Sequence, residues 1–96
     1  MTYRLRFHEL ALKEWKKLNE ALREQFKKKL AERLQNPRIP SAALSGMPDC
    51  FKIKLRKAGY RLVYRVDEDV VFVTVLAVGK RDKLRVYASA GGRIAE

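Results

Sequence analysis

The sequence has only one cysteine and one histidine, and it carries 11 acidic residues against 22 basic ones. A single cysteine cannot form an internal disulfide, which suits a reducing cytosol. One histidine and one cysteine cannot build a zinc site, and the acidic residues show no metal-ligand spacing. We therefore expect chemistry without a metal or any other cofactor.

Long apolar runs and an amino-terminal signal peptide are also missing. The longest apolar stretch, residues 70–78, is far shorter than the roughly 20 residues of a membrane helix. The first four residues, Met1 to Arg4, lack the apolar core of a signal peptide. With 47% hydrophobic residues among 96, the chain is expected to form one domain over residues 1–96, soluble and cytoplasmic.

Positive charge dominates what is present. The net charge is +11, which predicts an anionic partner, and nucleic acid is the commonest large one. One predicted helix carries five of the cations outside its apolar stripe: Arg23, Lys27, Lys28, Lys29 and Arg33. A solvated face is the simpler explanation of this run, and contact with a partner is the alternative.

The spacing of apolar residues predicts one short strand and two helices in the first half. Tyr3, Leu5 and Phe7 alternate with polar residues, as in a strand with one buried face. From His8 onward, apolar residues recur every three or four positions, with a break at Asn19-Glu20. All three prolines lie between residues 36 and 50, so we expect a connecting loop there.

Three strands are predicted in the second half, over residues 51–55, 60–66 and 70–78, joined by turns at residues 57–59 and 67–69. The third is nearly all apolar, which predicts a central strand covered on both faces. The tail from Asp82 begins like a short helix, which Gly91-Gly92 should fray or end. The fold class is α+β, ordered β-α-α-β-β-β, with helices packed on one face of a small sheet and a short C-terminal helical tail.

The first hairpin gathers positive charge. A turn over residues 56–59 makes Lys54 face Arg61, and side-chain alternation puts Lys52 on the same sheet face. Like charges facing each other destabilise a sheet by some tenths of a kcal/mol, and a bound phosphate would offset this repulsion. A solvated face of ordinary Lys and Arg remains the alternative, because solvent screens exposed charges.

Several motifs resemble the RelE toxins of bacterial toxin-antitoxin modules. They are Lys52 to Leu55, Gly59 to Tyr64, Val78 to Arg81, and Val86-Tyr87. RelE toxins are ribosome-dependent endoribonucleases that cut mRNA at the codon in the decoding site, and each is held inactive by a cognate antitoxin. The resemblance therefore implies a RelE-like fold and three partners: a RelB-type antitoxin, the decoding site of the 30S ribosomal subunit, and mRNA.

The resemblance also implies the site residues. Lys54 would be the general base, and Lys52 and Arg61 would hold the scissile phosphate. Arg81 would stabilise charge at the leaving side, and Tyr87 would stack on a nucleotide or orient it. Two further arginines of the same hairpin, Arg56 and Arg65, are candidate substrate-binding residues.

The chemistry can be worked out from the residues. A ribonuclease without a metal normally uses the ribose 2′-OH as nucleophile, because it already lies beside the phosphate. His8 lies between the first strand and helix, so a cap or surface role fits it better than that of a base. An ordinary lysine is neutral in only about one molecule in 2,500 at pH 7. Neighbouring cations and loss of water favour the neutral amine, so we expect the free protein to be a poor nuclease that the ribosome activates.

Two alternatives remain at this point. The first is a toxin of the related ParE type, which shares the fold and binds DNA gyrase without cutting RNA. The second is a simple basic module that binds nucleic acid, for which the charge of +11 suffices but no clustering is required.

Overall fold

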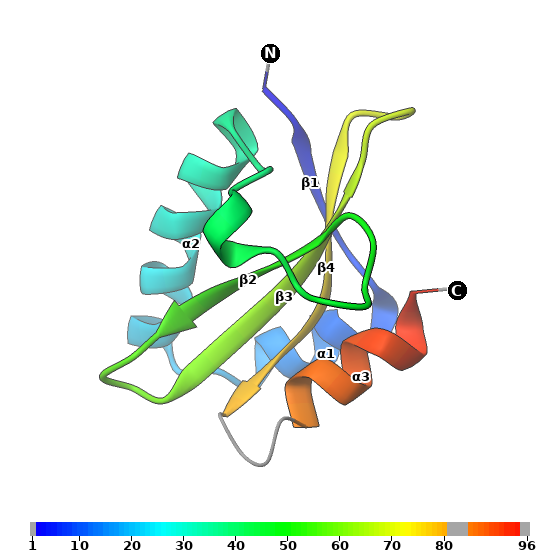
Figure 1. The fold of residues 1–96 in the computed structure, drawn as a ribbon. Coiled ribbons are helices and arrows are strands. Elements are labelled where there is room, and N and C mark those ends of the chain that lie inside the picture. Colours follow the sequence, from blue (N-terminus) through cyan, green and yellow to red (C-terminus); the bar gives the residue numbers. More distant parts are fainter. Residues whose placement is uncertain (1, 81–84, 95–96) are drawn as a thin grey trace.

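The structure is a computed structural model and describes residues 2–80 and 85–94. Its centre is a four-stranded sheet of order β1-β4-β3-β2 (Figure 1). The strands are β1 (Arg4–Phe7), β2 (Cys50–Leu55), β3 (Tyr60–Asp67) and β4 (Phe72–Lys80). β1 pairs in parallel with β4, and the other neighbours are antiparallel. The predicted α+β class, the order of elements and the central position of the last strand are confirmed.

Two helices, α1 (Glu9–Lys16) and α2 (Glu20–Gln35), cover one face of the sheet. Their starts follow from side-chain caps: the His8 ring accepts a hydrogen bond from Leu10 N at 3.1 Å, and Asn19 accepts one from Leu22 N at 2.9 Å. Phe26 of α2 is fully buried against the sheet. The break at Asn19-Glu20 and the capping role of His8 are thereby confirmed.

The helix α3 (Arg85–Arg93) packs on the opposite face of the sheet. Its two buried residues, Val86 and Ala90, contact a small second cluster that includes Val63 and Leu76. The expectation that Gly91-Gly92 ends this helix is wrong, because both glycines lie inside it. Arg93, which follows the glycines, donates hydrogen bonds to Glu14 and to Leu76 O, and these hold the last turn in place.

The last strand begins later than predicted. β4 starts at Phe72, whereas the apolar run starts at Val70. Val70 is 51% exposed, and Val71 has a positive φ of 57°, which no strand residue adopts. Both residues belong to the turn between β3 and β4, and β4 continues to Lys80, so the predicted strand of residues 70–78 was placed two residues too early at both ends.

The loop between α2 and β2 contains one short 3-10 helix, Pro40–Ala42, and one isolated bridge from Ala43 to Phe51. It otherwise lacks regular structure, as the three prolines predicted. Within residues 2–80 and 85–94, no helix is long and apolar enough to cross a membrane.

Candidate active site

The hairpin of β2 and β3 places two cations opposite each other. Lys54 pairs with Arg61 and Leu55 with Tyr60, which is the register predicted from the turn length. Gly59 closes the turn with a φ of 70°, a conformation that favours glycine. Lys54 and Arg61 are both half-buried, so solvent screens their repulsion less than it would at a fully exposed position.

A pocket of about 380 Å³ opens beside this pair, at the turn end of the hairpin. Its lining consists of Lys54, Leu55, Arg56, Gly59, Tyr60 and Arg61. Three of these residues are cationic and none is acidic. The pocket therefore has the charge and size to receive an anionic group such as a phosphodiester.

Tyr87 reaches this site from α3. Its phenolic oxygen accepts a hydrogen bond of 2.7 Å from Arg61 Nη1, and the guanidinium carbon lies 5.5 Å from the centre of the ring. The ring is half-buried against the second cluster. Because the oxygen accepts from Arg61, its own proton is directed elsewhere and can be donated to another acceptor.

Lys52 lies two residues before Lys54 on β2. It lines a second pocket of about 330 Å³, with Arg33, Ser41, Ala42, Lys54 and Arg56. Lys54 and Arg56 line both pockets, so the two form one basic surface around the hairpin. The structure thus brings together four predicted residues of the hairpin and Tyr87.

Arg33 ties α2 to this surface. It donates from Nη1 to Lys52 O at 3.1 Å and to the Tyr64 hydroxyl at 2.8 Å. Burial raises the pKa of Tyr64, although Arg33 acts against this. The phenol therefore stays protonated and donates to Pro37 O at 2.6 Å. The sequence left Arg33 between a solvated face and contact with a partner. Its place next to Leu30 and Leu34 of the apolar stripe was the signal for a partly buried position.

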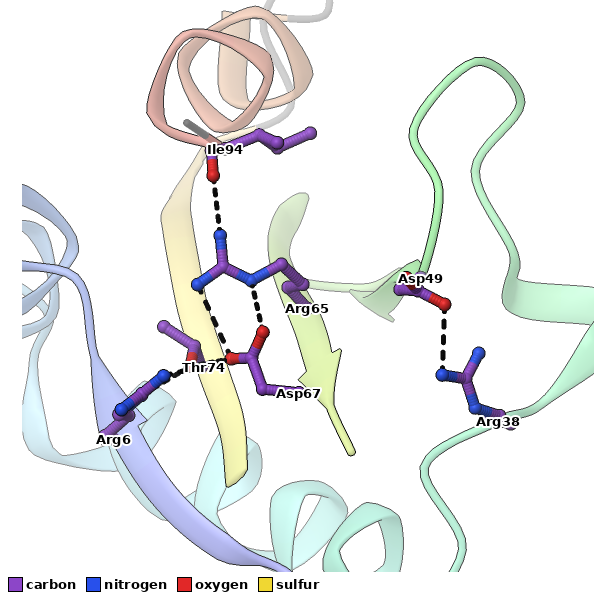
Figure 2. A network of polar contacts seen from close by, with 7 residues as sticks. All are labelled: Arg6, Arg38, Asp49, Arg65, Asp67, Thr74 and Ile94. Atoms are coloured by element: carbon purple, nitrogen blue, oxygen red, sulfur yellow. Dashed lines mark hydrogen bonds and ion pairs between the residues drawn. The ribbon is translucent and has the colours of Figure 1, made fainter. Parts of the chain in front are cut away.

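Arg65 is placed apart from the basic surface. It lies on β3 opposite Cys50, and its guanidinium is bonded to Asp67 at 2.7 and 3.4 Å and to Ile94 O at 2.7 Å (Figure 2). These partners direct it toward the C-terminal end of α3, and Arg65 lines neither pocket. The remaining predicted residue, Arg81, lies outside the described residues.

Two comparisons of sequence identify relatives. Residues 5–85 match the family described as "ParE toxin of type II toxin-antitoxin system, parDE". The chain is 57% identical over 94 residues to the mRNA interferase toxin RelE of Escherichia coli K12, covering 98% of this chain and 99% of the relative. It is equally similar to the mRNA interferase RelE of Shigella flexneri.

The fold agrees with these relatives. A mutant of the E. coli toxin RelE in the free state is 56% identical and superposes with a TM-score of 0.91, covering 98% of this chain and 99% of the other. RelE in the intact E. coli RelBE toxin-antitoxin complex is 58% identical with a TM-score of 0.81, covering 84% and 99%. On sequence and fold together, the chain belongs to the RelE/ParE family of toxins of type II toxin-antitoxin systems.

Proposed function

We propose that this chain is a toxin of the RelE type, an endoribonuclease that cleaves mRNA in the A site of the ribosome and so inhibits translation. The two curated relatives at 57% identity are named mRNA interferases, which supports this activity over gyrase binding. A RelB-type antitoxin is the inhibitory partner, in line with the solved RelBE complex of a 58% identical toxin. Ribosomes and mRNA as partners make the cytoplasm the place of action.

The reaction is attack of the ribose 2′-OH on the adjacent phosphate. The bond from phosphorus to the 5′-oxygen breaks, and the products are a 2′,3′-cyclic phosphate and a 5′-OH end. The pocket offers lysine, arginine and tyrosine side chains. Cationic nitrogens do not ligate divalent metals, whereas they stabilise the charge that develops on a phosphate during transfer.

Each residue has a distinct role in this mechanism. Lys54 removes the proton from the 2′-OH, and its cross-strand neighbour Arg61 favours the neutral amine and binds the phosphate. Tyr87, fixed by Arg61, orients the nucleotide. Lys52 holds the scissile phosphate together with Arg61, and Arg56 binds a neighbouring phosphate of the mRNA. Arg81 stabilises charge on the leaving group, a role that rests on the resemblance alone.

The observation that carries the proposal is the meeting of Lys54, Arg61 and Tyr87. Two like charges face each other across a hairpin, and a tyrosine from a distant helix bonds to one of them. Packing alone gives no reason to place the two cations together. A ribonucleotide phosphate between them would turn this repulsion into binding.

The test uses programmed ribosomes and an mRNA with a single 2′-deoxy nucleotide at the cleavage site. We expect cleavage of the unmodified message, with 2′,3′-cyclic phosphate and 5′-OH ends, and none at the modified position. Lys28→Ala, which removes an exposed charge of α2, serves as the matched control and should cleave normally. Absence of cleavage together with binding to gyrase would assign the chain to the ParE type.

A further inference from the structure

The helix that carries Tyr87 has little intrinsic stability. α3 has nine residues, and isolated helices of that length are marginal in water. Gly91 and Gly92 each cost about 1 kcal/mol of helix stability relative to alanine. A Cβ atom at either position would meet nothing within 4 Å, so close packing does not require the glycines. Contacts with the rest of the protein must hold this helix.

Two arginines make such contacts at its C-terminal end. Arg93 donates to both oxygens of Glu14 at 2.8 and 3.1 Å and to Leu76 O at 2.9 Å. From β3, Arg65 Nη1 donates to Ile94 O at 2.7 Å, one residue beyond the helix. The last carbonyls of a helix lack partners inside the helix, and cations are favourable there.

Arg65 is itself held in place by a partly buried polar network (Figure 2). Asp67 accepts two hydrogen bonds from Arg65, one from the Thr74 hydroxyl at 2.6 Å and one from Arg6 at 3.3 Å. The side chains of Arg65 and Asp67 are only 19% and 20% exposed. The guanidinium therefore has a fixed direction, with its third nitrogen, Nη1, donating to Ile94 O.

The charge state of Asp67 suits this role. Burial raises the pKa of its carboxyl, but hydrogen bonds from Thr74, Arg65 and Arg6 and the positive charge of Arg65 outweigh burial and lower it. Asp67 is therefore ionised at neutral pH, and its ion pair with Arg65 is formed under the conditions in which a toxin acts.

Strand β3 thus forms two hydrogen bonds with this part of the chain, one within α3 and one just beyond its last residue. Arg61 bonds to Tyr87 and Arg65 to Ile94. The distance along β3 from residue 61 to residue 65 is about 13 Å at the usual rise of a strand. The distance along the helix axis from residue 87 to residue 94 is about 10 Å at the usual rise of a helix. Because these lengths are similar, the helix can lie along the strand with both contacts formed. When the Arg65 contact is lost, Tyr87 is held only by its bond to Arg61, by the packing of Val86 and Ala90, and by the Arg93 bonds to Glu14 and Leu76 O on the side of α1.

We propose that Arg65, oriented by Asp67, is a positioning residue: it fixes the end of α3 and thereby holds the Tyr87 phenol against Arg61. This role replaces the substrate binding predicted for Arg65 from the sequence. It rests on the proposed function, because Tyr87 has to serve cleavage for its position to matter.

The test measures kcat and KM of cleavage on programmed ribosomes for Arg65→Gln, with Tyr87 and with Tyr87→Phe. With Tyr87 present, we expect Arg65→Gln to lower kcat about tenfold and to leave KM unchanged. With Tyr87→Phe already present, Arg65→Gln should cause no further loss, because both changes act through the Tyr87 hydroxyl. Adding Gly91→Ala and Gly92→Ala should restore the rate, since the helix then needs the anchor less. Arg38→Gln removes another arginine paired with carboxylates and is the control.

An equal loss in both Tyr87 backgrounds, or a raised KM, would overturn the proposal and return Arg65 to substrate binding. Amide hydrogen exchange of residues 86–94 provides a readout without activity: it should accelerate in Arg65→Gln and not in Arg38→Gln. If the parent protein does not cleave mRNA, the proposed function fails and the exchange rates alone decide the anchoring. Unchanged exchange in Arg65→Gln would refute the anchoring.

Discussion

Arg61 of β3 donates a hydrogen bond of 2.7 Å to the Tyr87 hydroxyl of α3, which joins the sheet to the helix that covers its second face. The contact has two consequences. It places an aromatic ring beside the cationic pair of Arg61 and Lys54, and it makes the position of that ring depend on how α3 is held. The stability of α3 can therefore be measured as a property that bears on the site.

The glycine pair in α3 limits the stability of this helix. Replacing both residues, Gly91→Ala with Gly92→Ala, should raise the free energy of unfolding by about 1 to 2 kcal/mol, because alanine favours the helix and the added methyl groups meet open space. Urea unfolding measures this difference. Gly59→Ala is the contrasting control and should destabilise, because Gly59 has a φ of 70°. A loss of stability in the double variant would contradict this account of α3.

Val71 should store backbone strain at the turn between β3 and β4. It is β-branched and has a φ of 57°, a conformation that costs such residues about 1 to 2 kcal/mol. Val71→Gly should therefore stabilise the protein slightly, by about 0.5 kcal/mol after the entropy cost of glycine. Thermal unfolding of Val71→Gly beside Val70→Gly tests this, since Val70 has no positive φ. Equal destabilisation by both changes would show that no strain is relieved.

Asp67 should contribute to stability in a pH-dependent way. Its pKa in the folded protein lies below the ordinary value of 3.8, so its contribution is complete above that value and is lost as the pH falls through the folded pKa. Asp67→Asn should unfold at lower urea concentration than the parent at pH 7 and pH 5. The difference in urea midpoint between the parent and Asp67→Asn should become smaller below about pH 4. A difference that stays constant down to pH 2 would mean that the carboxylate charge plays no part.

Cys50 should be unreactive in the folded protein. Burial raises the pKa of its thiol to about 11, with Arg65 acting in the opposite direction, and the side chain is 1% exposed. At pH 8 only about one thiol in 1,000 is ionised, and thiolates are the reactive form. Alkylation by iodoacetamide should then be slow in buffer and fast in denaturant. Rapid labelling of native protein would show that the second cluster opens readily.

Much of the fold follows from local patterns. The period of apolar residues predicts α1 and α2, and their caps at His8 and Asn19 set where each begins. The alternation of the hairpin and the length of its turn predict the pairing of Lys54 with Arg61, because a shift of one residue would expose the buried face. Three of the five residues that the structure brings together, Lys52, Lys54 and Arg61, were therefore predicted to share one face from the hairpin alone.

The rest depends on contacts between distant residues, which no local pattern records. Glu14 and Arg93 are 79 positions apart, and their ion pair keeps α3 helical through glycines that favour an end. The parallel pairing of β1 with β4 likewise joins residues 4–7 to residues 72–75. Arg65 looked like another cation of the hairpin, and only the structure reveals that Asp67 and Ile94 engage it.

The most direct test of the central claim is the single-turnover rate of mRNA cleavage on programmed ribosomes by Arg61→Ala, measured beside the parent and Lys28→Ala. If Arg61 stabilises the scissile phosphate, the rate should fall by about two to three orders of magnitude, while Lys28→Ala stays at the parental rate. Cleavage by Arg61→Ala at nearly the parental rate would contradict the assignment of this pocket as the catalytic site.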